Sequence, residues 1–330
     1  MFVLQLPSGF LPLIATSKSE SLAALFSRYL STINQVKSWS ESDPLDPESA
    51  AFKSIRRVRS MHRAIFERLN KSSLRPDVDQ VWVSQNAMVI TQWAFVGLVF
   101  MHPRECCISG DDEQVARTLA DFAYAWRCFA WMNGISDENN LCSGSLEETI
   151  ALSHVIFKDV YEPVIKAEKH VNPLGLQMGI DVQNVIGTYA TPGLTGEVVL
   201  TFWSGVFGIK MPYLRRLSFR ETICYYALVI GHMFLDGTWI RSWHTKRVRE
   251  RLEFMKENRE ELMARWHQHD DTKRYSAEQV AATPCGFYLA PDFVKQMTRV
   301  SGDEESVNDF IILDDEKNDE NDNAIQRTVG

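Results

Sequence analysis

Apolar residues recur every three or four positions along most of the chain, which is the spacing of one face of an α-helix. The first such pattern opens at residues 17–20, which have the spacing of a capping box, and should run to about Trp39. The second follows Asp46, a capping residue, and Pro47, which suits the first helical position, and should end near Asn70. No segment reads convincingly as a strand, so the sequence predicts an all-α helical bundle.

Further helices are predicted from the same spacing over residues 111–133, 146–170, 198–209, 219–240 and 244–266. Residues 81–101 are apolar over a length that would also suit a membrane span. Their amide and hydroxyl groups recur on one side of the helix. This arrangement favours a buried core helix over a lipid-facing one.

Three other segments lack the pattern of a long helix. Residues 1–16 are apolar but interrupted by Pro7 and Pro12, so an irregular N-terminal segment is expected rather than a signal peptide. Residues 171–200 are rich in Gly and Pro, which predicts a loop-rich connection or short helices. Residues 301–330 form an acidic run without apolar periodicity, which predicts a disordered tail. Residues 17–300 are expected to form a single helical domain.

Composition narrows the class of protein. The chain has 330 residues of which 45% are hydrophobic, enough for a sizeable core. Its net charge of -8 comes largely from the acidic end, and no basic patch with interleaved aromatic residues indicates nucleic-acid binding. The six cysteines include no C-x-x-C pair. We therefore expect reduced thiols and an intracellular location.

His62 interrupts the apolar face of the second predicted helix, between Val58 and Ile65. A neutral imidazole at such a position is either a core residue hydrogen-bonded to a carbonyl or a metal ligand. Arg57 and Arg59 lie on the turns just before it, and guanidinium groups bind carboxylates in a bidentate fork. An iron porphyrin presents both an iron and two propionates, so this arrangement indicates a candidate haem pocket.

Arg28 and Thr32 are i, i+4 neighbours on one flank of the first predicted helix, with Ser31 beside them. An arginine that faces a core needs a partner there, because a buried unpaired charge is costly. That partner would be an ordinary carboxylate, the edge of a haem or bound dioxygen.

Other polar groups favour structural roles. Residues 267–271, which include His267, His269 and two aspartates, lie in a polar stretch typical of solvated surface. His232 and Asp236 are i, i+4 neighbours in an apolar helix, where a buried hydrogen bond is the preferred interpretation over a functional site. The sequence has no phosphate loop, dinucleotide fingerprint or nucleophile elbow.

Residues 57–62, R-V-R-S-M-H, resemble the R-V-R-x-x-H signature of the catalytic-domain family shared by the endoplasmic-reticulum-bound oxygenase mpaB and the rubber oxygenases, or latex-clearing proteins. Arg28, Ser31 and Thr32 stand where that family carries an R-x-x-K-T or similar element. Residues 91–93 and 126–142 look like further elements of the family. The similarity covers roughly residues 22–154.

The resemblance implies an all-helical fold with a globin-like core, and a b-type haem whose iron is bound by His62. Arg28 and Thr32 would line the opposite face of the haem as catalytic residues. Arg57 or Arg59 would hold a propionate, an assignment that follows from charge alone. Family oxygenases cleave carbon–carbon double bonds of isoprenoid chains with dioxygen. We therefore expect an oxidoreductase that acts on an apolar small molecule and associates with the endoplasmic-reticulum membrane.

Two positions depart from the rubber-oxygenase pattern. The lysine that caps the iron in that family is Ser31 here, and its catalytic glutamate has no clear counterpart, because residues 11–14 are apolar and Glu20 lies too close to Arg28. An alternative is therefore a non-catalytic helical protein that keeps the fold and binds haem or a lipid. A membrane-embedded helical protein, with residues 81–101 and 219–240 as spans, is a third hypothesis.

Overall fold

The computed structural model describes residues 2–16, 18–71, 81–167, 172–234, 238–276 and residue 279. Within these ranges the chain is helical and contains no strand, which confirms the predicted all-α class. The elements are η1 (Phe2–Gln5), α1 (Pro7–Ala15), α2 (Leu22–Glu41), α3 (Ala50–Lys71), α4 (Gln85–Met101), α5 (Asp112–Met132), η2 (Asp137–Asn139), α6 (Leu146–Ile156), η3 (Phe157–Tyr161), α7 (Glu162–Lys166), α8 (Pro173–Ala190), α9 (Gly196–Phe207), α10 (Phe219–Phe234), α11 (Thr238–Glu257) and α12 (Arg259–His269).

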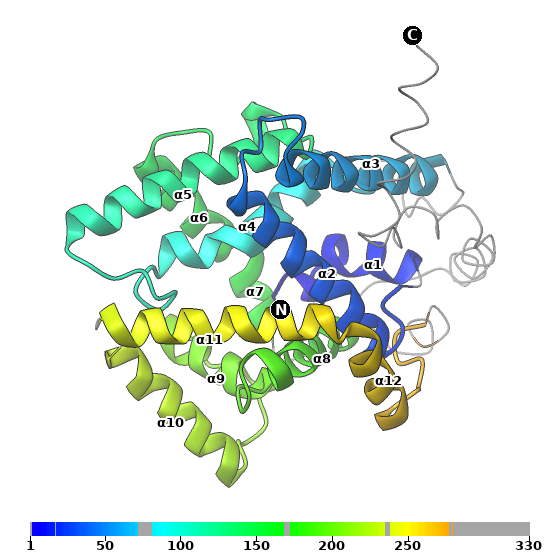
Figure 1. Ribbon diagram of the computed structural model, residues 1–330, viewed down its shortest axis with the longest axis vertical. Coiled ribbons are helices and arrows are strands. Elements are labelled where there is room, and N and C mark those ends of the chain that lie inside the picture. The colour runs from blue at the N-terminus through cyan, green and yellow to red at the C-terminus, as the bar shows by residue number, and fades with distance from the viewer. Residues whose placement is uncertain are drawn as a thin grey trace.

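Helix α2 lies in the middle of the molecule, with α3 above it and α11 and α12 below it in the view of Figure 1. Its N-cap is Ser21, whose hydroxyl accepts a hydrogen bond from the backbone N–H of Ala24. The helix therefore begins five residues after the predicted capping box opens. Because α2 packs against α3, α8 and α12, side chains on several of its faces lie close to other helices.

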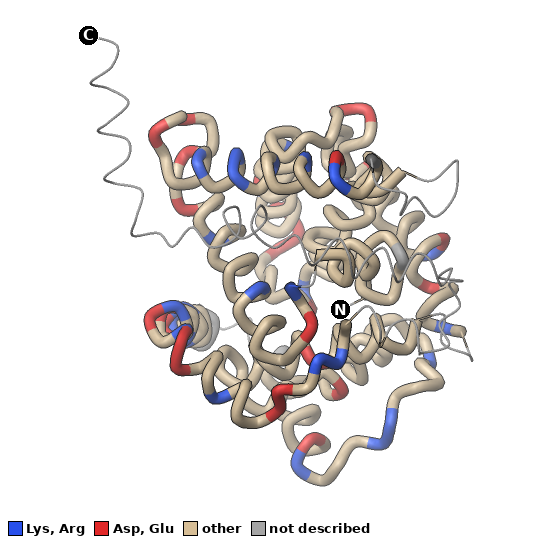
Figure 2. Tube along the Cα trace, turned by 90° about the vertical axis from the view of Figure 1, so that its right-hand side faces the viewer, with Lys and Arg blue, Asp and Glu red and all other residues tan. Residues whose placement is uncertain are grey.

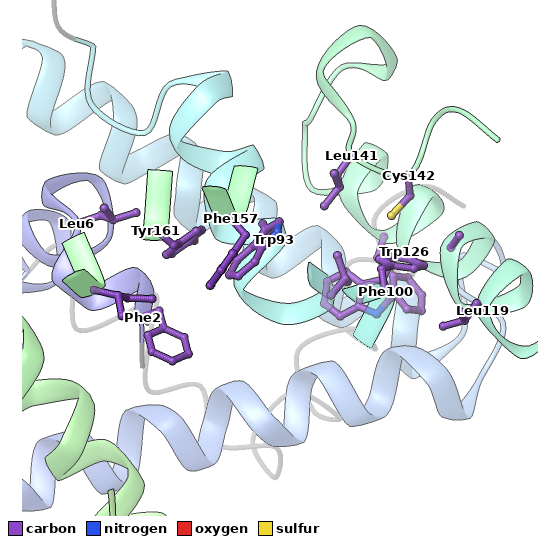
Figure 3. Packing of buried hydrophobic residues seen from close by; sticks show 14 of the residues in the cluster. Phe2, Leu6, Trp93, Phe100, Leu119, Trp126, Leu141, Cys142, Phe157 and Tyr161 are labelled. Atoms are coloured by element: carbon purple, nitrogen blue, oxygen red, sulfur yellow. The ribbon is translucent and has the colours of Figure 1, made fainter. Parts of the chain in front are cut away.

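Two clusters of buried apolar side chains form the core. The first joins α1, α2, α8 and α12, and includes Phe10 and Leu25. The second joins α4, α5 and the segment from η3 to α7, and includes Trp93, Phe100 and Trp126, which are labelled in Figure 3. Helix α3 contributes to both clusters, since its first half packs in the second and its last turns pack against the first.

The N-terminal segment is not irregular, contrary to the sequence prediction. Residues 2–5 form η1 and residues 7–15 form α1, with Pro7 at the first helical position, where its missing N–H costs nothing. Phe2, Phe10 and Ile14 are buried. The prolines suggest breaks, but Pro7 starts a helix, Pro12 lies within it, and the segment is apolar enough to enter the core.

The segment predicted as loop-rich contains an 18-residue helix, α8, followed closely by α9. Pro173 again occupies the first helical position, after the N-cap Asn172. Gly175 is required for packing, because a Cβ there would lie 1.9 Å from the carbonyl oxygen of Leu4. Gly175 therefore does not mark a loop; it lets the backbone of α8 approach that of η1 closely.

Some predicted helix boundaries agree with the structure, and two predicted helices are divided. Helix α5 begins directly after its N-cap Asp111 and ends before Asn133 and Gly134, where φ is +103°. The helix predicted over residues 146–170 is observed as α6, the π-helical turn η3 and α7. The surface helix predicted over 244–266 is broken at Asn258 into α11 and α12, and its sparse apolar residues Met255 and Leu262 are buried.

Charged residues of both signs are interleaved over the helices, as Figure 2 shows. Helix α4 is a core helix as preferred from the sequence, with Trp93, Val96 and Phe100 buried. None of the helices in the described ranges has the length and apolar character needed to cross a bilayer. The predicted acidic tail, residues 301–330, lies outside the described residues.

Candidate functional site

His62 lies in the second half of α3, one turn after the buried Val58. Its side chain is half-buried, and its Nδ1 is shielded from solvent without a hydrogen-bond partner among the described residues. Burial, together with the nearby positive charge of Arg28, lowers the pKa of His62 to about 4. The imidazole is therefore neutral at physiological pH and keeps the lone pair that a metal ligand needs.

Arg28 projects from α2 toward the same region, since its charge acts on the His62 ring. Its Nη1 donates a hydrogen bond of 3.3 Å to the hydroxyl of Thr16, directly after α1. No Asp or Glu of the described residues pairs with it, and burial lowers the pKa of the guanidinium. Arg28 is thus a desolvated cation whose neighbours are a hydroxyl, a neutral imidazole and the phenol of Tyr29, whose pKa burial raises.

The two hydroxyl groups next in sequence are engaged by their own helix. Thr32 donates to the backbone carbonyl of Arg28 at 3.1 Å, and Ser31 donates to that of Ser27 at 3.0 Å. Each oxygen keeps lone pairs with which it can accept a hydrogen bond, but its proton is already used. The structure therefore leaves Arg28 as the donor of this group.

The two arginines before His62 point in different directions. Arg59 donates from Nη1 to the carbonyl of Met132 at 3.3 Å, at the C-terminal end of α5. Arg57 is half-buried and has no hydrogen bond or ion pair with another described residue. Five positions separate it from His62, which places it roughly 140° away around the helix. Arg28, from another helix, is the cation that the fold brings to the imidazole.

Residues 91–93 and 126–142, the other segments that resemble the oxygenase family, make contacts that hold the chain together locally. Gln92 of α4 is buried, and its amide donates to Asn140 Oδ1 at 3.0 Å and accepts from the backbone N–H of Leu141 at 3.2 Å. Asn140 also donates to the carbonyl of Arg127. The ring nitrogen of Trp93 donates to the carbonyl of Ser153 at 2.9 Å. The contacts of Gln92 and Asn140 fix the loop after η2 against α4 and α5, and the contact of Trp93 holds α6 against α4, so both are structural roles.

The other polar groups considered from the sequence form no metal or catalytic site among the described residues. His267 and Asp271 form an exposed pair at 2.9 Å, as expected for solvated surface. Asp236 and the side chain of His232 lie outside the described residues. Across the described ranges, no three His, Cys, Asp or Glu side chains converge to hold a metal ion, and the cysteines are free thiols. The open hollow around Arg274 is lined by none of the predicted site residues.

Thr16 is the site residue that the sequence did not reveal. Its hydroxyl also donates to the carbonyl of Leu13, so it is held at the C-terminal end of α1 while it accepts from Arg28. The available signal was a threonine directly after nine helical residues, but this segment was predicted to be irregular.

Two of these side chains have the chemistry that a b-type haem asks of its protein partners. A shielded ring nitrogen without a partner, on a neutral imidazole, is suited to an iron, and an acid-free guanidinium is suited to a carboxylate or a polar oxygen. No family model matches the sequence, and no curated protein or solved structure is significantly similar to it.

Proposed function

We propose that this protein is a haem-dependent oxidoreductase of the oxygenase type, acting with dioxygen on an apolar, isoprenoid- or lipid-like molecule. The observation that carries the proposal is the pair of His62 and Arg28: a neutral imidazole with a shielded, unpartnered nitrogen beside a cation without a carboxylate partner in the described chain. Both groups are costly to bury alone, and a haem would satisfy both at once.

Each residue has a distinct role in this proposal. His62 would bind the iron through its neutral ring. Arg28, held by Thr16, would donate hydrogen bonds to an anionic or polar group on the same cofactor or on the substrate. Thr32 would accept a hydrogen bond there, because its own proton goes to the carbonyl of Arg28. Arg59, one turn before His62, remains our candidate for a propionate, whereas Arg57 lies on another side of α3 and is no longer one. Haem supplies the dioxygen chemistry when bound, while the chain sets its polarity and access.

The cellular setting follows from the same proposal. An apolar substrate is concentrated in membranes, so we propose association with a membrane, of which that of the endoplasmic reticulum is our candidate, and an intracellular location. The free thiols in the described part of the chain are compatible with that location.

A second candidate function is a non-catalytic protein that binds haem or a lipid without turnover. The hydroxyls of Ser31 and Thr32 favour it, because both donate to backbone carbonyls. Glu20 favours it as well, since it forms an ion pair of 3.2 Å with Lys273 and is not available as a base beside Arg28.

An absorption titration of the pure protein with haem tests the proposal. We expect a Soret band that is lost or strongly shifted in His62→Ala and kept in His154→Ala, which alters an exposed histidine. Wild-type protein without a Soret band would remove the haem proposal. Oxygen uptake with a prenyl substrate then separates the two candidates, because only the oxygenase consumes dioxygen.

A further inference from the structure

Helix α10 presents an apolar face to solvent. Phe219, Ile223, Tyr226 and Ile230 are spaced by four, three and four residues, so they lie along one side of the helix. Their exposed fractions are 84%, 54%, 58% and 50%. Scattered exposed apolar residues are normal on a protein surface, but a continuous row of large ones marks an interaction site.

The helix is held firmly at one end and packs against one main neighbour. Its principal contact is with α9, and in Figure 1 it lies at the lower edge of the molecule, below α9 and α11. At its start, Glu221 accepts hydrogen bonds from the hydroxyls of Ser218 and Thr195 and from Arg215, whose Nη2 lies 2.7 Å away. The apolar face is therefore displayed by a fixed helix, and no described element covers it.

Arg216 and Arg220 flank Phe219 in sequence at the start of this face, and Lys210 lies in the segment between α9 and α10. Lys210, Arg216 and Arg220 are exposed, and none forms an ion pair with an acidic residue in the described ranges. Residues 219–231 contain one acid, Glu221, and Arg215 holds its carboxylate. A second copy of this face would therefore offer the three cations no acidic partner, whereas anionic lipid headgroups would.

We propose that α10 is an interfacial membrane-binding helix that docks this protein on an anionic lipid bilayer. The apolar row would enter the boundary between headgroups and acyl chains, and Lys210, Arg216 and Arg220 would contact lipid phosphates and carboxylates. Tyr226 suits that depth, because its ring is apolar and its hydroxyl can stay in the polar layer. The proposal does not rest on haem binding and holds for a protein without catalytic activity.

Flotation of the whole chain with lipid vesicles tests whether α10 binds an anionic bilayer. We compare vesicles of phosphatidylcholine alone with vesicles that also contain phosphatidylserine. Three cations near the surface should strengthen binding to the anionic vesicles by roughly tenfold or more. Ile223→Asp combined with Ile230→Asp should weaken binding to both by more than about tenfold. Arg216→Gln combined with Arg220→Gln should remove most of the preference for phosphatidylserine.

Matched controls lie on α6 and η3. Leu152→Asp combined with Val155→Asp places the same charges at positions that are 43% and 51% exposed, and Lys158→Gln removes an exposed cation elsewhere; both should bind like wild type. Circular dichroism checks that each variant is folded. Wild-type protein that ignores anionic vesicles, or α10 variants that bind them undiminished, would overturn the proposal. So would a dimer that the α10 variants dissociate in the absence of vesicle binding, since α10 would then be a subunit interface.

Discussion

Arg28 of α2 lies close enough to His62 of α3 for its positive charge to lower the pKa of the imidazole. Burial of the ring makes the larger contribution to the same shift. The helices that carry them, α2 and α3, pack against each other, and the charge of Arg28 makes the protonated form of the imidazole less favourable. A buried cation without a carboxylate partner in the described chain costs folding free energy, and such an arrangement is typical of a site kept for binding or chemistry.

Replacing the cation by an apolar side chain of similar length should therefore stabilise the haem-free protein. We expect Arg28→Met to raise the free energy of unfolding by about 1–2 kcal/mol, because a desolvated charge is removed. Urea denaturation measures the change. Arg57→Met, at a half-buried arginine on α3, is the control and should stay within about 0.5 kcal/mol of wild type. A loss of stability in Arg28→Met would show that its charge is compensated in the folded chain.

The buried amide of Asn140 should be important for stability. It accepts from Gln92 and from the backbone N–H of Cys142, and it donates to the carbonyl of Arg127. Asn140→Ala removes these three buried hydrogen bonds, and we expect a loss of about 3 kcal/mol in the free energy of unfolding. The neighbouring Asn139→Ala loses one exposed hydrogen bond and should cost less than about 1 kcal/mol. Equal effects in thermal unfolding would contradict this role for Asn140.

The stability of the α9–α10 corner should depend on pH through Glu221. Hydrogen bonds from Arg215, and further ones from Ser218 and Thr195, hold the pKa of Glu221 well below its usual range. The unfolded chain therefore takes up the proton first as the pH falls below about 4.5, so the contribution is complete above that value and is lost in acid.

Glu221→Gln tests this dependence. At neutral pH we expect the variant to be roughly 1–3 kcal/mol less stable than wild type. The difference should stay constant down to about pH 5 and shrink below pH 4, as followed by urea denaturation at each pH. A difference that grows in acid would contradict the lowered pKa.

The N-terminal helix should be part of the folded core. Phe10 is 1% exposed and packs in the same cluster as Leu25. We expect Phe10→Ala to cost about 3–5 kcal/mol, whereas Phe254→Ala, at a position that is 49% exposed, should cost less than about 1 kcal/mol. Chemical denaturation of the two variants measures both values, and similar small losses would show that α1 is dispensable.

The sequence predicted those parts of the fold that depend on local signals. Asp111 marks the start of α5 within one residue, because capping and apolar periodicity act over a few positions. Helix α8 was missed because its glycines suggested a loop. At Gly175 the glycine is instead required by a contact distant in sequence, because the carbonyl oxygen of Leu4 leaves no room for a side chain. The predicted helix over residues 244–266 is interrupted at Asn258, although no proline lies in that stretch. Apolar periodicity does not reveal this interruption.

The arrangement of the candidate residues was likewise predictable only in part. Arg28 and His62 were each identified on a helix, and the structure places them within reach of one another. Thr16 was missed because its role depends on the packing of α1 beside α2, a tertiary contact. The direction of Arg59 toward Met132 likewise depends on where α5 ends, and charge alone did not indicate it.

The burial of η1 has a consequence for biosynthesis. The carbonyl of Leu4 accepts from the side-chain amide of Asn172, which is translated 168 positions later. At typical elongation rates, roughly 10–30 s pass before that partner leaves the ribosome. During this interval an apolar stretch containing Phe2, Leu4 and Leu6 lacks its neighbours in α8, although α1 already follows it. Production of this protein should therefore respond to the supply of ribosome-bound chaperones.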